Sequence, residues 1–386
     1  MRTILGAALA ASLALTTVHA EDKAPNPPLF SEQVGAFDPA APLPEDKGGL
    51  LAQALALYGR EDLRDRLMAA KKIAPCTVDA AHPDAVQAIV DGANASGLLI
   101  INEAHYEPRG RALIGRVLER LHADGFTVYA AETFAADVRG PDFAARPWPA
   151  FDDGGYSNDP VFGRTMRSAK ALGYRFVDYE YDAEDPRMQD PNVDVGVRED
   201  IQAENLMARI FAAEPNAKAV IHVGHGHAAE VAFRTGDGTE TRMMALRLKD
   251  KLGRDPFTVN TTYYTSPSSE PAVCTFVPSG PDDSPRMDLF IGLPAPAYED
   301  GRPVWRRHDL GDHAIAVPAA FAGQSEKLAI EARPAGEPPL AVPLDRVLVY
   351  PGETLPLLLP PGTYTVRAYS WSKGWLPDEV PLTVPD

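Results

Sequence analysis

Short apolar runs alternate with segments of helical periodicity through the middle of the chain. The runs have the length of buried β-strands and lie at residues 97–101, 126–131, 174–179, 219–223 and 257–262. Between them, apolar residues recur at helical spacing over residues 111–123, 162–172, 193–213 and 243–252. Strands that alternate with helices in this way form a parallel or mostly parallel sheet covered by helices. The pattern therefore predicts an α/β fold.

The segments that precede this alternation differ from it in composition and residue pattern. Residues 50–72 and 76–93 carry helical patterns, whereas residues 21–48 are rich in Pro and polar residues. We therefore predict an extended, Pro-rich leader over 21–48, followed by an α/β domain over 49–275.

The C-terminal part of the chain changes texture again. Pro and Gly become dense, and the apolar patterns shorten to strand length at residues 328–332, 347–350 and 363–368. Short strands between turn residues are typical of β-sandwiches. We expect a small β-sandwich-like module over residues 276–386, without a catalytic constellation of its own.

The first twenty residues have the pattern of a secretory signal peptide. Arg2 provides the positive start, residues 4–15 form a short apolar run, and Val18-His19-Ala20 offers small residues for cleavage. The run is too short for a permanent membrane anchor, and no later stretch has spanning length. The sequence thus predicts an exported protein, periplasmic or secreted, without a transmembrane segment.

The net charge of the chain narrows its possible binding partners. The chain has 37 Lys and Arg residues against 54 Asp and Glu residues, a net charge of −17, which disfavours binding to nucleic acid.

Its two cysteines, Cys76 and Cys274, flank the predicted α/β domain. In an oxidising compartment they can pair, but two buried free thiols are an equal alternative.

Ionisable residues gather where the predicted strands end. Glu103 and His105 follow the first strand, Glu132 the second, Glu180 the third, and a Gly-His-Gly-His sequence the fourth. Ligands of open parallel sheets bind beyond the carboxyl ends of the strands. We therefore expect a polar crevice at this edge, with a small-molecule or peptide substrate.

The residue types suit acid–base chemistry. Glu103 can hold a proton-accepting tautomer of His105, which would act as the general base. Glu132 could orient this imidazole or be the base itself, and Arg109 or Arg111 could stabilise an oxyanion. Each residue also has a purely structural interpretation, and the acidic run around Glu180 is expected to be a solvated face.

A metal site is a further hypothesis. His105, Glu132, His225 and His227 could supply nitrogen and oxygen ligands to Zn²⁺ or Mn²⁺, although their spacing matches no closed metal motif. The sequence has neither a Gly-x-Gly-x-x-Gly after the first strand nor a Gly-x-Ser-x-Gly. These absences argue against a dinucleotide enzyme and a nucleophile-elbow serine hydrolase.

Several of these motifs resemble one superfamily, which joins erythromycin esterases, ChaN-like haem-binding proteins and TraB/Tiki proteins. Asn102-Glu103-Ala104-His105 resembles its Gly-Glu-x-His signature, with Asn102 in place of the usual glycine. The resemblance spans roughly residues 95–262, and its other motifs are Ala130-Ala131-Glu132, Arg198 with Glu204-Asn205-Leu206-Met207, and Gly224-His225-Gly226-His227.

The branches of the superfamily imply different functions. The esterase branch implies that His105 activates water, Glu132 supports it, Arg109 stabilises charge and His227 completes the site. The Tiki branch implies a metal-dependent peptidase, and the ChaN-like branch implies haem bound through His105 or Tyr106. We therefore expect a hydrolase of esters or amides, with a haem- or metal-binding protein without turnover as the alternative. A cell-envelope interaction protein with a decayed site is a third possibility.

Overall fold

The computed structural model describes residues 28–44, 49–69, 71, 73–190, 193–234, 238–278 and 284–386. The predicted signal peptide, residues 1–20, lies outside this range, as does part of the predicted leader. The described part of the leader contains a short helix, α1 (Ser31–Ala36).

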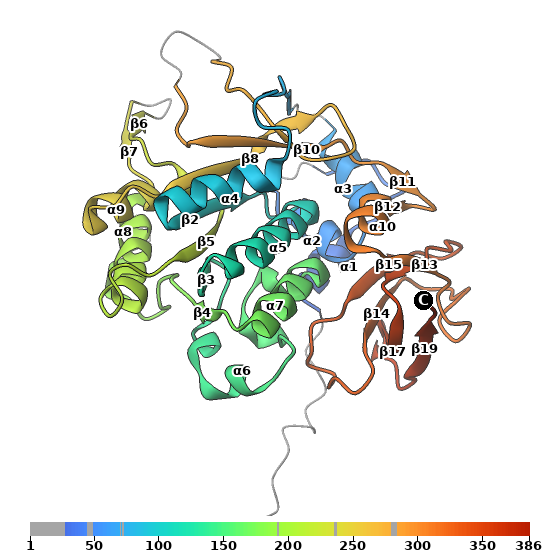
Figure 1. Ribbon diagram of the computed structural model, residues 1–386. Helices are drawn as coiled ribbons and strands as arrows, with labels where there is room; N and C mark the ends of the chain where they lie inside the picture. The colour runs from blue at the N-terminus through green and yellow to red at the C-terminus, as the bar shows by residue number, and fades with distance from the viewer. Residues whose placement is uncertain are drawn as a thin grey trace, which may run out of the picture.

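An eight-stranded sheet forms the centre of the larger part of the molecule (Figure 1). Its strands follow the order β4-β3-β5-β2-β8-β10-β9, with β1 paired to β8. All pairings are parallel except that of β9 with β10. The fold is therefore α/β, as predicted. The strands are β1 (Ala74–Pro75), β2 (Leu98–Glu103), β3 (Val128–Ala131), β4 (Arg175–Val177), β5 (Ala219–Gly224), β8 (Phe257–Ser266), β9 (Ala272–Val273) and β10 (Leu289–Pro294).

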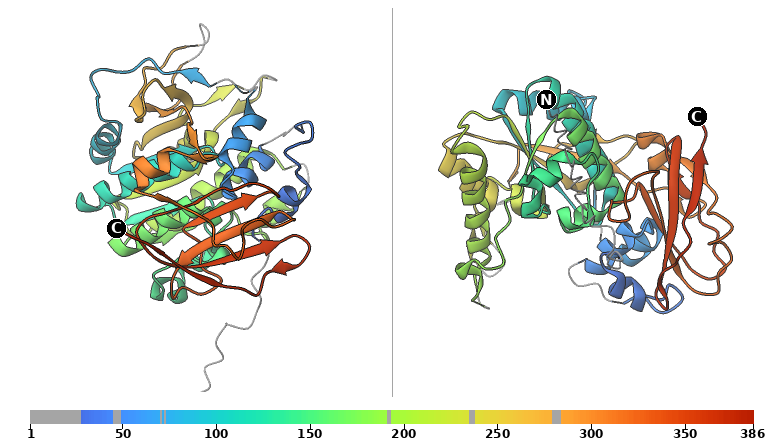
Figure 2. Two further views of the ribbon diagram at one scale, coloured as in Figure 1. Left: turned by 90° about the vertical axis from the view of Figure 1, so that its right-hand side faces the viewer. Right: turned by 90° about the horizontal axis from the view of Figure 1, so that it is seen from below.

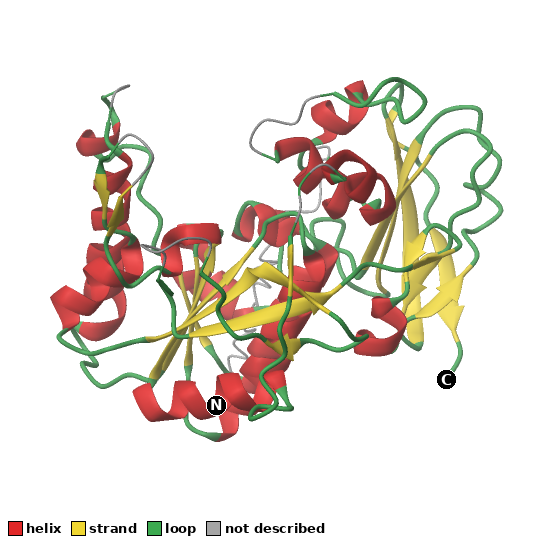
Figure 3. Ribbon diagram, turned by 90° about the horizontal axis from the view of Figure 1, so that it is seen from above, coloured by secondary structure: helices red, strands yellow, loops and turns green. Residues whose placement is uncertain are grey.

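Helices cover both faces of this sheet (Figure 3). Because side chains alternate along a strand, Leu99 and Ile101 of β2 pack under α4, α5 and α7, whereas Leu98 and Ile100 pack under α8 and α9. The helices are α4 (Ala85–Ser96), α5 (Pro108–Ala123), α6 (Pro141–Ala145), α7 (Pro160–Leu172), α8 (Val195–Leu206) and α9 (Met244–Leu252). Short 3-10 turns and a small hairpin, β6 (Phe233–Arg234) with β7 (Glu240–Thr241), complete this part.

The structure differs from the predicted elements at three places. The helical pattern over 50–72 forms two helices, α2 (Leu50–Leu57) and α3 (Glu61–Met68), separated at Gly59, whose positive φ of 68° ends α2. The pattern over 76–93 becomes helical only from α4 onwards, because the preceding residues pair along the edge of the sheet. The main sheet also continues past residue 275, since β10 belongs to it.

The C-terminal part is antiparallel. A sheet of order β15-β14-β17-β18, with β19 paired to β17, packs on the pair β13 and β16. Its other face packs on α1 and α2, so the N-terminal helices cover the C-terminal sheet (Figure 2). The elements are β11 (Tyr298–Glu299), β12 (Arg302–Pro303), α10 (Trp305–Leu310), β13 (His313–Ile315), β14 (Leu328–Pro334), β15 (Asp345–Val349), β16 (Leu357–Leu359), β17 (Gly362–Ser370), β18 (Gly374–Trp375) and β19 (Val380–Val384).

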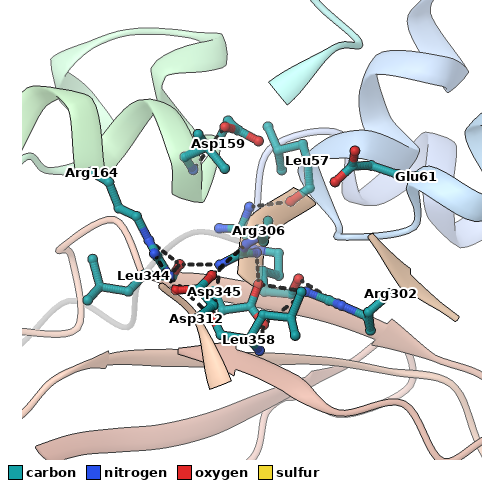
Figure 4. A network of polar contacts seen from close by, with 12 residues as sticks. Leu57, Glu61, Asp159, Arg164, Arg302, Arg306, Asp312, Leu344, Asp345 and Leu358 are labelled. Carbon is teal, nitrogen blue, oxygen red and sulfur yellow. Dashed lines mark hydrogen bonds and ion pairs between the residues drawn. The ribbon is translucent and has the colours of Figure 1, made fainter. Parts of the chain in front are cut away.

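Buried charges join the C-terminal sheet to the α/β part (Figure 4). Asp345 accepts hydrogen bonds from Arg302 at 2.7 and 3.0 Å and also pairs with Arg306. Asp312 pairs with Arg306 at 2.9 Å and with Arg164 of α7 at 2.6 Å. Three guanidinium groups thus share two buried carboxylates, which fixes how the two parts dock.

Cys76 and Cys274 form a disulfide, with Cα atoms 5.3 Å apart. The bridge closes a separation of 198 residues and ties the segment before α4 to the strands at the edge of the main sheet. The structure thereby selects the paired alternative over two free thiols.

None of the helices in the described ranges combines the length and the apolar character needed to cross a bilayer.

We expect Asp345→Asn to lower the free energy of unfolding by about 3–5 kcal/mol, because it removes the buried counter-charge of Arg302 and leaves Arg306 with Asp312 alone. Urea denaturation followed by circular dichroism measures this effect. Asp378→Asn, at an exposed position of the same module, is the control and should change little. Equal stability of the two variants would contradict a docking role for the buried charges.

We expect the double variant Cys76→Ser, Cys274→Ser to lose about 2–5 kcal/mol of unfolding free energy, because the unfolded chain is then no longer constrained. Thermal denaturation with and without dithiothreitol measures the loss. The reductant should lower the Tm of the wild type and leave that of the variant unchanged. A reductant effect of the same size on both proteins would rule out this bridge as its cause.

Candidate active site

Glu103 is the last residue of β2, and its side chain is fully buried. Arg111, in the first turn of α5, donates two hydrogen bonds to its carboxylate, at 2.8 and 2.9 Å. His222 Nε2 lies 3.0 Å from the same carboxylate. Burial alone would raise the pKa of Glu103, but the charges of Arg111 and His222 hold this pKa well below its usual range. Glu103 is therefore an ionised carboxylate at neutral pH.

His105 forms a hydrogen bond with this carboxylate. Its Nδ1 lies 3.1 Å from Glu103 Oε1, and its backbone carbonyl accepts a hydrogen bond from Arg111 at 2.7 Å. The ring packs on Tyr156, with centroids 4.3 Å apart, and 23% of the side chain is exposed. Since an ionised carboxylate can only accept, the proton resides on Nδ1 and the Nε2 lone pair is available. Among the described residues, this Nε2 has no hydrogen-bond partner.

Gly224, at the end of β5, lets two functional groups meet above the backbone. A Cβ atom here would lie 2.5 Å from His105 Nε2 and 2.9 Å from Glu132 Oε2, closer than real Cβ contacts allow. The Gly224 N–H also donates to Glu132 Oε2 at 2.6 Å. A side chain at this position would displace the imidazole, so the close approach requires glycine.

Glu132 is held from several sides. Arg198 donates to its Oε1 at 2.7 Å, and the Tyr156 hydroxyl lies 3.4 Å from its Oε2. Burial raises the pKa of Glu132, but His227, His105 and Arg198 outweigh burial and lower it. Its lone pairs are occupied, so Glu132 is placed to act as a fixed negative charge rather than as a proton acceptor.

Arg198 of α8 links Glu132 to Glu180. Its Nε donates to Glu180 Oε1 at 3.1 Å, its Nη2 also pairs with Glu180, and Gln202 donates to Oε2 at 3.1 Å. The interpretation of the acidic run as a solvated face is therefore wrong for Glu180. The sequence could not show this, because the partner cation lies 18 residues further along the chain.

His227 completes the cluster. Its Nδ1 lies 2.7 Å from the buried Glu199, and its Nε2 lies 3.7 Å from Glu132 Oε1 and 3.3 Å from Arg198 Nη1. Burial lowers the pKa of His227, but Glu199 and Glu132 outweigh burial and raise it. Its environment therefore favours the protonated imidazole, in contrast to the tautomer that Glu103 imposes on His105.

Arg109 does not reach this cluster. Its guanidinium pairs with Asp309 at 2.8 Å and donates to the Ser269 carbonyl at 2.8 Å. The prediction that Arg109 stabilises an oxyanion is therefore not supported by its position. Arg111 and Arg198 are the cations that the fold brings to the site.

His225 and Tyr106 line the neighbouring side. The His225 ring lies 5.1 Å from that of His105 and 6.1 Å from that of Tyr106. His225 has a positive φ of 36°, and its carbonyl accepts a hydrogen bond from Asn102 Nδ2 at 2.5 Å. Burial and the nearby charges of His105 and Lys71 lower the pKa of His225 to about 4. The side chain is thus neutral at physiological pH.

The arrangement does not fit a metal ion held by His105, Glu132, His225 and His227. The Arg198 guanidinium contacts both Glu132 and His227 and supplies the positive charge that a cation would bring. In the part of the chain that the structure describes, no three or more His, Cys, Asp or Glu residues are grouped to hold a metal ion.

The two residues considered for haem have protein partners. His105 is held through Nδ1 by Glu103, and the Tyr106 hydroxyl accepts a hydrogen bond from Lys71 Nζ at 2.5 Å. Haem binding stays a prediction.

Topology explains why these residues meet. β2 is followed by α5 on one face of the sheet, and the adjacent β5 is followed by α9 on the other. Loops that diverge in this way open a crevice at the carboxyl ends of the two strands. Glu103 ends β2 and His105 follows it, and His225 and His227 follow β5, so all four lie at this edge of the sheet.

Several contacting residues had little signal in the sequence. His222 and Tyr156 contribute through burial and close packing, and Glu199 through a single ion pair with His227. The burial of His222 could have been predicted from the alternation of side chains along a strand, since His222 lies two positions after the buried Val220 of β5. Tyr156 and Glu199 carried no comparable pattern.

No protein-family model and no curated protein sequence matches this chain. Among solved structures, the RRSP effector domain of a MARTX toxin from Vibrio vulnificus is 16% identical, with a TM-score of 0.34 over 47% of this chain and 36% of that chain. Another, described as bacterial protein toxins, is 15% identical, with a TM-score of 0.33 over 55% of this chain and 45% of that chain. The chain thus spans less than half the length of either toxin structure.

Proposed function

We propose that this protein is an exported hydrolase that uses His105 to activate water against an ester or amide. The observation that carries the proposal is the pairing of the buried Glu103 with the partly exposed His105, whose Nε2 lies next to Glu132 and Gly224. A carboxylate that fixes the tautomer of a partly exposed imidazole is the arrangement a general base requires.

The reaction can be written for these residues with its protons balanced. His105 Nε2 takes a proton from water while the oxygen attacks the carbonyl carbon, which gives a tetrahedral oxyanion. The imidazolium then returns this proton to the leaving alcohol or amine as the carbon–oxygen or carbon–nitrogen bond breaks. Glu103 stays ionised throughout and stabilises the imidazolium.

Arg198 and His227 are the groups suited to stabilise the oxyanion. Both are cationic in this environment and lie within 3.3 Å of each other, which Glu132, Glu180 and Glu199 make possible by compensating their charge. Charges fixed before the reaction cost little reorganisation when the oxyanion forms.

The Cys76–Cys274 disulfide supports the proposed export, since such bridges persist in oxidising compartments. The signal-peptide pattern of the first twenty residues points to the same compartment. We retain the resemblance to the erythromycin esterase, ChaN and Tiki superfamily as part of this proposal.

We expect His105→Ala to lower kcat/KM on p-nitrophenyl esters by about 10²–10⁴-fold, the usual contribution of a positioned general base. Gly224→Ala should also lower kcat/KM, because its methyl group displaces the imidazole although the substitution removes no ionisable group. Initial rates of p-nitrophenolate release from esters and of p-nitroaniline release from anilides, with circular dichroism to verify folding, measure both.

The matched control is His82→Ala, which removes an exposed histidine that is likewise paired with a carboxylate. It should retain wild-type rates. If the wild type, His105→Ala and Gly224→Ala are equally active or equally silent across ester and amide substrates, the hydrolase proposal fails.

We expect Glu199→Gln to lower the pKa of His227, because it removes the carboxylate that raises this pKa. The protonated His227 is lost as pH rises through its pKa, so the alkaline limb of the pH–kcat/KM profile should move to lower pH. Titration of the imidazole resonances by NMR measures the pKa directly. Glu214→Gln, at an exposed glutamate, is the control and should leave the profile unchanged. An unmoved His227 resonance in Glu199→Gln would contradict the assignment.

A further inference from the structure

A groove of about 740 Å³ lies along the middle of β8 and beside the start of β10, two strands labelled in Figure 1. Its walls are largely apolar and aromatic, and they include Ile73, Tyr263, Tyr264, Phe276 and Val277. This volume is within the range of small-molecule sites, which are also mostly apolar.

Three large apolar side chains of this groove are exposed to water, which is unfavourable in free energy. Ile73 is 46% exposed, Tyr263 45% and Val277 54%. Seven large apolar side chains are exposed in the described part of the chain, and these three of them share one groove. Exposed apolar residues that cluster mark a surface on which an apolar group is buried on binding.

An irregularity in β8 opens the groove. β2 pairs with β8 only as far as Val259, after which the two strands separate. Asn260 Oδ1 then accepts the backbone N–H groups of Thr262 and Tyr263, at 2.9 and 3.0 Å, and replaces a strand partner. Irregularities of this kind re-aim side chains next to active sites.

The disulfide holds the two walls of the groove together. Pro75 and Thr77 flank Cys76 on one wall, and Phe276 and Val277 follow Cys274 on the other. The disulfide therefore fixes the two walls of the groove relative to each other.

A chain of side-chain contacts links the groove to the candidate active site. Lys71, which lines it, donates to the Tyr106 hydroxyl at 2.5 Å, and the Tyr106 ring faces that of His225, next to His105. On the groove's floor, Asn260 precedes Thr261, whose N–H donates to Asn102 Oδ1 at 2.7 Å.

The charges of the groove favour an electron-rich group at its inner end. Lys71 and Arg286 line it, and among the residues that the structure describes none of the lining residues is acidic, although the chain has a net charge of −17. A carbonyl or carboxylate oxygen attached to an apolar chain would match both the walls and these cations.

We propose that this groove binds the acyl chain of the substrate, so that the enzyme prefers esters or amides of long, apolar carboxylic acids. This specificity rests on the proposed hydrolase function. The chain would lie along Tyr263, Phe276 and Val277, with its carbonyl group directed towards His105.

The chain-length dependence of hydrolysis tests the proposal. With p-nitrophenyl acetate, butyrate and octanoate, kcat/KM of the wild type should rise by about fourfold for each methylene buried. Val277→Asp places a charge on the wall and should flatten this dependence. Leu43→Asp introduces the same charge at another exposed apolar position outside the groove and should keep the wild-type slope.

Calorimetric titration with decanoate separates the groove from the catalysis. Decanoate should bind the wild type and His105→Ala with similar affinity, and Val277→Asp at least tenfold more weakly. If no protein hydrolyses any ester but decanoate still binds in a Val277-dependent manner, the hydrolase function fails and the groove is an acyl-chain site. If His105-dependent hydrolysis is independent of chain length, or decanoate binds Val277→Asp as well as wild type, the groove proposal is overturned.

Discussion

The buried ion pair of Glu103 and Arg111 is the contact on which the candidate site depends. A carboxylate without exposure would be neutral if it stood alone, because burial disfavours its charge. Arg111 keeps it ionised and also lies 3.3 Å from Asp159, whose side chain caps the first turn of α7. One guanidinium thus joins the end of β2 and the starts of α5 and α7. Removal of Arg111 would leave the buried Glu103 carboxylate without the guanidinium that stabilises its charge.

Two groups of charged residues lie close to the Glu103–Arg111 pair, one on each side of the sheet. On the α5 side of the sheet, Glu103 sets the tautomer of His105. On the α8 side, Glu132 and its neighbours hold Arg198 and a protonated His227. Gly224 lets the two clusters approach, and Tyr156 contacts both His105 and Glu132. Two histidines in different settings are therefore brought together, one held in a single tautomer by Glu103 and one whose pKa Glu199 and Glu132 raise.

The C-terminal module supports the site indirectly. Arg346 of β15 donates to the carbonyls of Leu57 and Asn158, and Asn158 precedes the α7 cap Asp159. Together with Asp345 and its arginines, these contacts dock the module in one orientation (Figure 4). Buried charges of this kind contribute less to net stability than to the choice of one arrangement, because misaligned docking would leave them unpaired. The N-terminal helices and the C-terminal strands therefore also help to hold the candidate site in place.

The sequence by itself determined the α/β fold and the strand ends where the chemistry lies. Its apolar runs placed Glu103, His105, Glu132 and His227 at one edge of the sheet. It could not choose between Arg109 and Arg111, which lie two positions apart on one helix and point to different sides. Nor could it pair Cys76 with Cys274, bring Glu180 to Arg198, or end the main sheet at β10 rather than at residue 275. These outcomes depend on contacts between distant segments, and only the packing of helices on the sheet fixes which side chains come within hydrogen-bonding distance.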